Sequence, residues 1–308
     1  MGRPWTLTEI DTIRENIHLS DQAIGILINR TGTSVKWKRQ RLGLFKENRK
    51  RITKYQINLN FFKEWNDPMA YALGFIYSDG TIRINKAKFH YSFKIAIKDL
   101  TLLQKINSAM ASNIPIKPRI IPTGILYELS IGRKSMVYDL VSLGLIPNKS
   151  RIMKFPKIPE NFLLPFIRGY FDGDGSVLFL SNRLKVKITS GSEAFIREMQ
   201  VKFSELNLQT SMRIVSAKNR KNPWYEINIL GNSRKEFFDL IYRDASIYLE
   251  RKYQVFQSYF ARPILKTDCL GCGKSIIKKN TQHVRCRPCS RAYGIIRDRK
   301  RASIRTGM

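Results

Sequence analysis

Apolar residues recur at helical spacing in three short segments near the N-terminus. The first segment, WTLTEIDTIRENIH, carries them three or four positions apart, at Leu7, Ile10, Ile13 and Ile17. Thr6 and Glu9 have the spacing of a capping box at the start of this helix. Ser20 can cap a second helix over SDQAIGILIN, and Thr33 or Ser34 can cap a third that ends before the glycine of RLGL. The pattern predicts a small all-helical unit over residues 1–45, followed by a charged linker over 46–60.

The middle of the chain shows one order of elements twice. Residues 67–81 and 163–176 each carry a helical pattern that ends in Asp-Gly. Alternating segments follow, TIRINKAKFHYSFKIAIK and SVLFLSNRLKVKIT, which predict strand hairpins. A helix, two more strands and a closing helix follow in each half. The strand segments Tyr127-Glu128-Leu129 and Tyr225-Glu226-Ile227 correspond, and the period is 95 residues, from position 79 to position 174. The chain is therefore expected to be an α+β protein with two αββαββα halves, residues 61–160 and 161–262.

The first helix of each half carries a stripe of small or helix-initiating residues four apart: Ala70, Gly74 and Ser78, then Pro165, Gly169 and Gly173. Asp67 can cap the first of these helices, with Pro68 at its first position. Small stripes let two helix backbones approach closely, so the two helices are expected to pack side by side. Each helix ends in Asp-Gly, which would bring Asp79 and Asp174 together at one end.

Two carboxylates at the negative ends of two helix dipoles need a positive partner, and a divalent cation meets that need. Asp-Gly is also a common turn pair, so simple helix termination is the alternative explanation of either motif alone. Its occurrence twice, each time after a small-residue helix, favours the metal site.

The composition points to a polyanionic partner. Lys and Arg number 55 against 24 Asp and Glu, a net charge of +31, and basic residues occur in every segment. Nucleic acid fits best, because Lys and Arg contacts to phosphates release counterions. A generic basic protein and a binder of anionic membranes are the alternatives. No apolar run is long enough to span a membrane, and no signal-peptide core is present, so we expect no membrane association and no secretion.

Basic residues on the predicted third helix and in the hairpins are candidate DNA contacts. Three short helices with a basic last one resemble the helix-turn-helix units appended to some phage nucleases, with a plain helical bundle as the alternative. The hairpin residues would face a DNA groove from two twisted sheets, unless they only form a solvated face. The candidates are Lys36, Lys38, Arg39 and Arg41 on the helix, and Lys86, Lys88, Lys94, Arg183, Lys185, Lys187, Lys218 and Arg220 on the strands and turns.

All four cysteines of the chain fall in one segment. Cys269, Cys272, Cys286 and Cys289 form the pattern C-x2-C-x13-C-x2-C. Two such pairs can direct four thiolates at one ion, which predicts one structural Zn²⁺ within residues 263–308. A redox role or free thiols are the alternative. We expect this element and the tail RDRKRASIR to contact DNA, with the tail disordered until bound.

Residues 72–80, ALGFIYSDG, and 167–175, IRGYFDGDG, resemble the two motifs of single-chain LAGLIDADG homing endonucleases. The resemblance covers about residues 61–260. It implies a saddle on DNA and a metal role for the last acid of each motif, Asp79 and Asp174. Asp172 matches the first acid, which is usually structural, whereas Tyr77 replaces that acid in the first motif.

The resemblance also implies a basic residue after the last strand of each half, and Lys149 and Lys252 are the candidates here. Each could instead be an ordinary phosphate contact or surface charge. Two or three Mg²⁺ ions would serve hydrolysis, with the carbonyls of Ser78 and Gly173 as further oxygen ligands.

The predicted function is site-specific hydrolysis of both strands of a long, asymmetric double-stranded DNA target by a monomer. An RNA-splicing maturase, which would bind RNA, and a non-cleaving DNA-binding regulator are the alternatives. The chain begins with Met and lacks a terminal His-Asn, so we expect a free-standing or intron-encoded enzyme. It would act in a prokaryotic or phage-infected cytosol, or in a nucleus or organelle.

Overall fold

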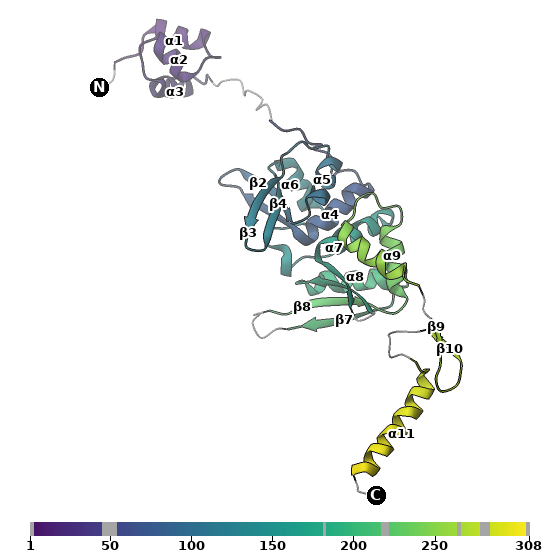
Figure 1. Ribbon diagram of the computed structural model, residues 1–308. Coiled ribbons are helices and arrows are strands. Elements are labelled where there is room, and N and C mark those ends of the chain that lie inside the picture. The colour runs from purple at the N-terminus through teal and green to yellow at the C-terminus, as the bar shows by residue number, and fades with distance from the viewer. Residues whose placement is uncertain are drawn as a thin grey trace. The chain divides into compact units, whose positions relative to one another are not determined.

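The computed structural model describes residues 3–44, 54–180, 183–216, 222–263, 266–277 and 284–305. The chain divides into two compact units, residues 1–55 and 56–308. Figure 1 shows the order of their elements. In the described part of the chain, no helix has both the length and the apolar character needed to cross a membrane.

The first unit contains three helices, α1 (Leu7–Glu15), α2 (Asp21–Leu27) and α3 (Gly32–Arg41). The predicted capping box is confirmed: the Glu9 amide donates to Thr6 Oγ1 at 3.2 Å, and the Thr6 amide donates to Glu9 Oε2 at 2.9 Å. Ser20 caps α2 as predicted. The third helix begins earlier than predicted, because Thr31 supplies its cap.

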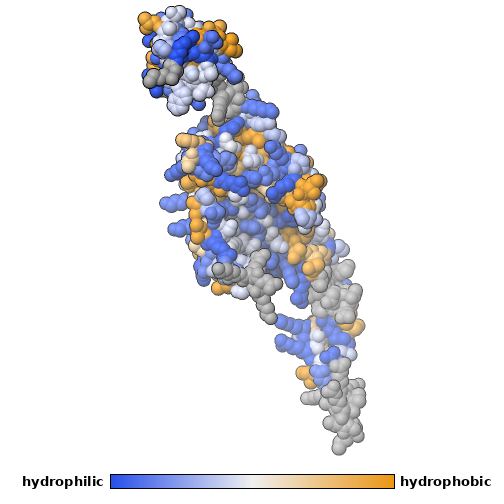
Figure 2. Space-filling view, turned by 90° about the vertical axis from the view of Figure 1, so that its left-hand side faces the viewer, coloured by the Kyte–Doolittle hydropathy of each residue, from blue (hydrophilic) through white to orange (hydrophobic). Residues whose placement is uncertain are grey.

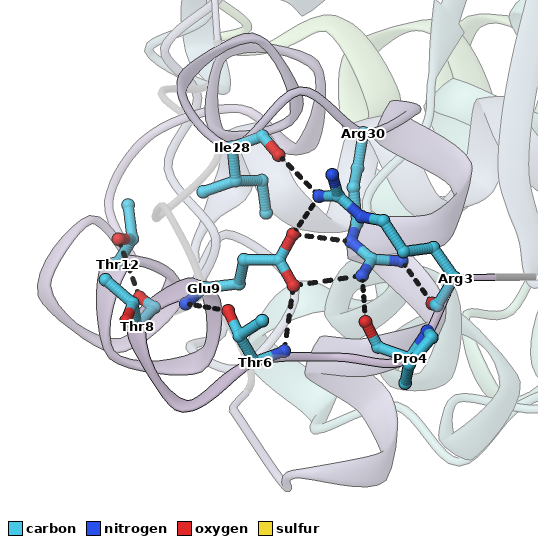
Figure 3. Close-up of polar contacts among 8 residues, drawn as sticks. All are labelled: Arg3, Pro4, Thr6, Thr8, Glu9, Thr12, Ile28 and Arg30. Atoms are coloured by element: carbon cyan, nitrogen blue, oxygen red, sulfur yellow. Dashed lines mark hydrogen bonds and ion pairs between the residues drawn. The ribbon is translucent and has the colours of Figure 1, made fainter.

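Four side chains form the core of this unit: Ile13, Ile24, Ile28 and Val35. Leu7 follows the helical spacing but is 80% exposed and lies outside this core. A polar cluster supports the small core. Glu9 accepts hydrogen bonds from Arg30 Nε and Nη2, both at 2.9 Å, and also contacts Arg3 (Figure 3).

The first half of the second unit runs through α4 (Asp67–Asp79), β1 (Gly80–Asn85), β2 (His90–Ile97), α5 (Leu100–Ala109), β3 (Lys117–Ile121), β4 (Gly124–Ile131) and α6 (Lys134–Ser142). Asn66, rather than Asp67, supplies the cap of α4, and Pro68 lies in its first turn as predicted. The predicted order of elements is confirmed in this half.

The second half repeats that order through α7 (Leu163–Asp174), β5 (Gly175–Leu180), β6 (Arg183–Ser190), α8 (Glu193–Glu205), β7 (Thr210–Val215), β8 (Trp224–Ile229) and α9 (Ser233–Tyr242). Two short 3-10 turns, Lys149–Arg151 and Glu160–Phe162, lie between the halves. A further helix, α10 (Glu250–Phe260), follows α9 and was not expected from the sequence.

Each half builds a four-stranded antiparallel sheet. The strand orders are β1-β2-β4-β3 and β5-β6-β8-β7, so the two sheets have the same topology. The registers also correspond, since Ala96 pairs with Glu128 and Thr189 pairs with Glu226. The correspondence of the two Tyr-Glu segments is therefore confirmed. Helices cover one face of each sheet and leave the other face open (Figure 1); we call these the helix face and the open face.

Helices α4 and α7 pack directly against each other through their small residues. A Cβ added to Gly74 would lie 2.0 Å from the Phe166 carbonyl oxygen, and one added to Gly169 would lie 2.0 Å from that of Tyr71. The two contacts are equivalent in the repeat, because 166 and 169 are 95 residues beyond 71 and 74. Only glycine permits this approach, which confirms the predicted side-by-side packing.

The C-terminal element contains β9 (Lys266–Asp268), paired antiparallel with β10 (Ser275–Ile277), and helix α11 (Arg287–Arg305). The tail RDRKRASIR lies within α11. The expectation of a disordered tail is therefore wrong for the described residues, because helix α11, which begins at Arg287, continues through it.

Candidate active site

Helices α4 and α7 end together at their two final aspartates. Asp79 and Asp174 are the last residues of these helices, and the glycine that follows each donates its amide back into its own helix. A Cβ built on Gly173 would lie 1.8 Å from Ser78 Oγ and 3.1 Å from Asp79 Oδ2. The end of α7 thus touches the end of α4, and the structure brings the two predicted acids into one site.

The two carboxylates share an unfavourable electrostatic environment. Burial first, and the nearby Asp79 carboxylate second, raise the pKa of Asp174 to about 6. Burial also raises the pKa of Asp79, while Lys252 and Lys149 act in the opposite sense. Among the described residues, no ion pair within 4 Å reaches either carboxylate. Two crowded oxygen donors of this kind suit a hard divalent cation.

Lys149 lies in the 3-10 turn that follows the first half. Its side chain is 7% exposed, and Nζ donates to the Ser78 carbonyl at 3.1 Å. Burial lowers the pKa of Lys149, whereas Asp174 and Asp79 raise it. The ammonium therefore lies within the field of both acids and lines the same cavity as Asp174.

Lys252 lies on α10 and makes more hydrogen bonds than Lys149. It is 3% exposed, and Nζ donates to the carbonyls at the end of α7: Phe171 at 2.6 Å, Asp172 at 2.8 Å, Gly173 at 3.4 Å and Gly175 at 2.6 Å. Burial lowers the pKa of Lys252 to about 8, although these carbonyls favour its charged form. Lys252 therefore caps the negative end of α7, and the two lysines are not equivalent.

The carbonyls of Ser78 and Gly173, predicted as further metal ligands, each accept a hydrogen bond from one of these lysines. A carbonyl oxygen has two lone pairs, so one acceptor site remains on each. Their role as metal ligands stays a prediction.

Asp172 lies apart from the candidate metal site. It is 1% exposed and accepts hydrogen bonds from Tyr71 Oη at 2.8 Å, Tyr242 Oη at 2.9 Å and the Leu249 amide at 2.8 Å. These bonds tie α7 to the partner helix α4 and to the segment before α10. The structural role suggested by the resemblance agrees with this geometry.

Tyr77 occupies the corresponding position in the first half. Its hydroxyl donates to the Leu143 carbonyl at 2.7 Å, just beyond α6. Gly144 has φ +91°, and a Cβ there would lie 2.7 Å from that hydroxyl. Tyr77 thus ties its helix to the rest of the first half by donating a hydrogen bond, whereas Asp172 does so in the second half by accepting hydrogen bonds.

A cavity of about 690 Å³ opens beside Asp174. Its wall includes side chains from both helix ends and from the open face of the second sheet: Ser78, Lys149, Asp174, Lys187, Thr189 and Glu226. Thr189 Oγ1 donates to the Asp174 carbonyl at 3.0 Å, so strand β6 supports the end of α7. The site therefore continues without interruption onto the sheet.

The structure describes six of the eight hairpin residues predicted to contact DNA. Arg183, Lys185 and Lys187 lie on the open face of β6, because the intervening Leu184 and Val186 are buried. Lys187 pairs with Glu226 at 2.9 Å, and Lys94 pairs with Glu128 at 2.8 Å in the equivalent position. Lys86 and Lys88 lie in the exposed β1–β2 turn, and Lys218 and Arg220 fall outside the described residues.

Glu128 and Glu226 are functional candidates that the sequence pattern indicated only for register. Glu226 is 2% exposed and also accepts hydrogen bonds from Arg213 at 2.7 and 2.9 Å and from the Trp224 ring nitrogen at 3.1 Å. The sequence signal for these Lys–Glu pairs is a glutamate that recurs at the same strand position in both halves, among basic residues.

On the three-helix unit, Lys36 and Arg41 are exposed and Lys38 is half-buried beside the Trp5 ring. Arg39, predicted as a DNA contact, is 4% exposed. It donates to Asp21 Oδ1 at 2.8 Å and to the Ile17 carbonyl at 2.7 Å. Arg39 is therefore a structural residue of this unit, because its guanidinium satisfies carbonyl groups inside it.

The four cysteine sulfurs form a cluster. They lie within 4.8 Å of one another, and Cys272 Sγ is 3.7 Å from Cys286 Sγ. Cys269 Sγ accepts hydrogen bonds from the amides of Cys286 at 3.1 Å and Gly271 at 3.4 Å. Four converging sulfurs with amide donors suit a closed tetrahedral zinc site.

Comparisons with known proteins agree with the fold of the second half. Residues 161–242 match a family model described as LAGLIDADG-like domain. The second half of the core is similar to that domain. The LAGLIDADG-like match begins just before α7 and ends with α9, so it contains Asp172 and Asp174.

The chain matches its curated relatives over only part of their length. The chain is 27% identical over 185 residues to a probable translation initiation factor IF-2 of Methanocaldococcus jannaschii, covering 57% of this chain and 15% of that relative. It is 26% identical over 145 residues to the protein of the same name from Thermococcus kodakarensis, covering 45% and 12%. The chain thus matches only a small part of the length of these relatives.

Solved structures to which the chain is similar include I-DmoI in complex with DNA and Ca, at 18% identity and a TM-score of 0.44, covering 62% of this chain and 94% of that chain. The homing endonuclease I-WcaI bound to its DNA recognition sequence has 16% identity and a TM-score of 0.43, covering 70% and 97%.

Proposed function

We propose that the chain is a site-specific DNA endonuclease whose cleavage site contains Asp79 and Asp174. The observation that carries this proposal is the meeting of two raised-pKa carboxylates at the joined ends of α4 and α7. The two carboxylates have no cationic ion-pair partner among the described residues, and the basic open face of the second sheet adjoins them. The LAGLIDADG-like match over the second half supports the same function.

Asp79 and Asp174 would hold Mg²⁺ and, in the proposal, each acid serves one DNA strand. The chemistry that Mg²⁺ supplies when bound is an activated water and charge stabilisation at the phosphate. Lys149 holds the Ser78 carbonyl and offers its ammonium to the cavity, where it can bind a phosphate oxygen. Lys252 orients the end of α7 and is a positioning residue.

Double-stranded DNA would lie across the two open sheet faces. Arg183 and Lys185 are exposed there, and the surface in Figure 2 is mainly hydrophilic with small apolar areas. Lys36 and Arg41 on α3 would add phosphate contacts through a second binding unit. A second unit on the same chain raises affinity through effective concentration.

The cysteine cluster would hold one structural Zn²⁺ and fix the start of α11. Metal analysis of the purified chain tests this: about one zinc per chain is expected, and Cys269→Ala should lose it. A metal-free wild-type chain with unchanged protease resistance would contradict the assignment.

Cleavage of a plasmid library in the presence of Mg²⁺ tests the function. The expected result is linear product from one discrete sequence, which identifies the target. A wild-type chain that binds DNA but cuts no library member, nor the DNA flanking its own gene, would contradict the nuclease. Selective binding to a structured RNA would then favour the maturase, and selective binding to DNA the regulator.

A further inference from the structure

Two exposed leucines interrupt the basic open face of the second sheet. Leu178 is 46% exposed and Leu180 is 57% exposed, both on strand β5. Val177, just before them, is 7% exposed, and Phe179, between them, is 38% exposed. Alternation along a strand places Leu178 and Leu180 on the face opposite Val177 and Phe179.

Strand β5 is held in this orientation from its helix face. The Phe179 ring lies 5.5 Å from the Tyr259 ring of α10, and the Arg262 guanidinium lies 4.1 Å above the Phe179 ring. Phe179 thus packs on one side against the end of α10 and the residue Arg262 just after it. Leu178 and Leu180 consequently point outward and cannot turn into the core without breaking this packing.

Their cross-strand neighbours are cations. Leu178 pairs with Lys185, Leu180 pairs with Arg183, and both partners are exposed. The open face therefore alternates apolar and positively charged side chains at its outer edge. The cations make the patch complementary to a polyanion, and the leucines give that polyanion an apolar group to contact.

The first sheet differs at the same positions. Arg83 pairs with Ser92 where Leu178 pairs with Lys185, and Asn85 pairs with His90 where Leu180 pairs with Arg183. Arg83 and Asn85 are exposed hydrogen-bonding side chains, which can read guanine and adenine edges. The halves are alike in topology but unlike in the chemistry they present at this edge.

We propose that Leu178 and Leu180 read thymine by contacting its 5-methyl groups in the major groove. The inference rests on the proposed function and assigns thymine to the part of the target under β5. The methyl is the apolar feature that a major groove offers to an aliphatic side chain. The equivalent part of the other half-site is read by hydrogen bonds from Arg83 and Asn85 and should not depend on thymine methyls.

Single thymine-to-deoxyuridine replacements in the cleaved target test this, because they remove only the methyl group. Binding of the full wild-type chain is measured for each replacement, without added divalent cation. One or two replacements in the half-site under the second sheet should weaken binding about fourfold each. The double variant Leu178→Ala/Leu180→Ala should bind the thymine and uracil targets equally well.

Val201→Ala is the matched control, since Val201 is 49% exposed on α8, at the helix face. This variant should keep the wild-type sensitivity to uracil. Uracil that has no effect in that half-site, on a target the chain cuts, would overturn the inference and leave the proposed function standing. Uracil sensitivity that survives in the leucine variant would also overturn it. If no sequence is cut or selectively bound, the proposed function fails, and the inference fails with it.

Discussion

Asp172 and Asp174 lie two positions apart on α7 and have opposite surroundings. Asp172 accepts three hydrogen bonds from neutral donors deep in the fold, whereas Asp174 lies beside a second carboxylate at the helix end. The difference follows from helical geometry, because residues two apart point about 200° apart around the axis. One acid is thereby available for structure and the other for chemistry.

Lys149 and Lys252 should differ in their contribution to stability. Lys252→Met leaves several buried carbonyls without a donor and should lower the free energy of unfolding by at least about 3 kcal/mol. Lys149→Met removes a single such bond and should cost about 1 kcal/mol. Urea unfolding followed by circular dichroism measures both.

Lys185→Met is the control for these variants, because Lys185 is exposed on β6 and should change stability by less than about 0.5 kcal/mol. Equal losses at Lys149 and Lys252 would contradict the assignment of Lys252 as the cap of α7.

Glu9 should make the three-helix unit sensitive to acid. Hydrogen bonds from Arg30 first, and the Thr6 amide next, lower the pKa of Glu9 from 4.5 to about 2. A lowered folded-state pKa adds stability that is complete above pH 4.5 and is lost as the pH falls toward 2. Glu9→Gln should therefore be less stable than the wild type above pH 4.5, and the difference should shrink toward pH 2.

Methyl NMR of Ile13 and Ile24, which are fully buried in this unit, can follow its unfolding in urea within the full chain. A difference between wild type and Glu9→Gln that stays constant from pH 6 to pH 2 would contradict the ion pair's role.

The pairing of α4 with α7 depends on glycine at the crossing. Gly74→Ala would place a methyl group 2.0 Å from the Phe166 carbonyl, so the helices must separate. We expect a loss of about 1–3 kcal/mol in unfolding free energy, together with reduced cleavage, because the helix ends carry the two acids. Gly294→Ala on α11 has open space around it and should be neutral or slightly stabilising. A neutral Gly74→Ala would contradict the close packing.

The repeated elements could be predicted because local patterns determine them. The caps at Thr6 and Ser20, the alternating strands and the small-residue stripes are all readable from neighbours in sequence. Long-range contacts were not readable in this way. Arg39 looks like its neighbours on a basic helix, and only the fold shows that it turns inward to Asp21.

The same limit applies to the candidate site. The meeting of Asp79 and Asp174 could be predicted from the stripes that precede them. The unequal hydrogen bonding of Lys149 and Lys252 could not, because it depends on where α10 packs against α7.

At the scale of the whole molecule, basic residues occur in both compact units, so affinity for DNA should depend strongly on salt. Removing one cation that binds a phosphate reduces the steepness of log K against log salt concentration by about 0.9. Lys36→Ala/Arg41→Ala should therefore reduce the slope by up to about 2 on target and non-target duplexes alike. Lys63→Ala, in the segment before α4, is the control and should leave the slope unchanged. An unchanged slope in the α3 variant would exclude that helix from the phosphate contacts.

In the proposed function, Asp79 and Asp174 together form the cleavage site. The direct test is cleavage of the identified target, with each strand labelled separately, by the wild type, Asp79→Asn and Asp174→Asn in the presence of Mg²⁺. We expect the wild type to cut both strands, and each variant to bind the target with near wild-type affinity but to lose cleavage by at least about 100-fold. Variants that cut both strands at the wild-type rate would contradict the proposed function.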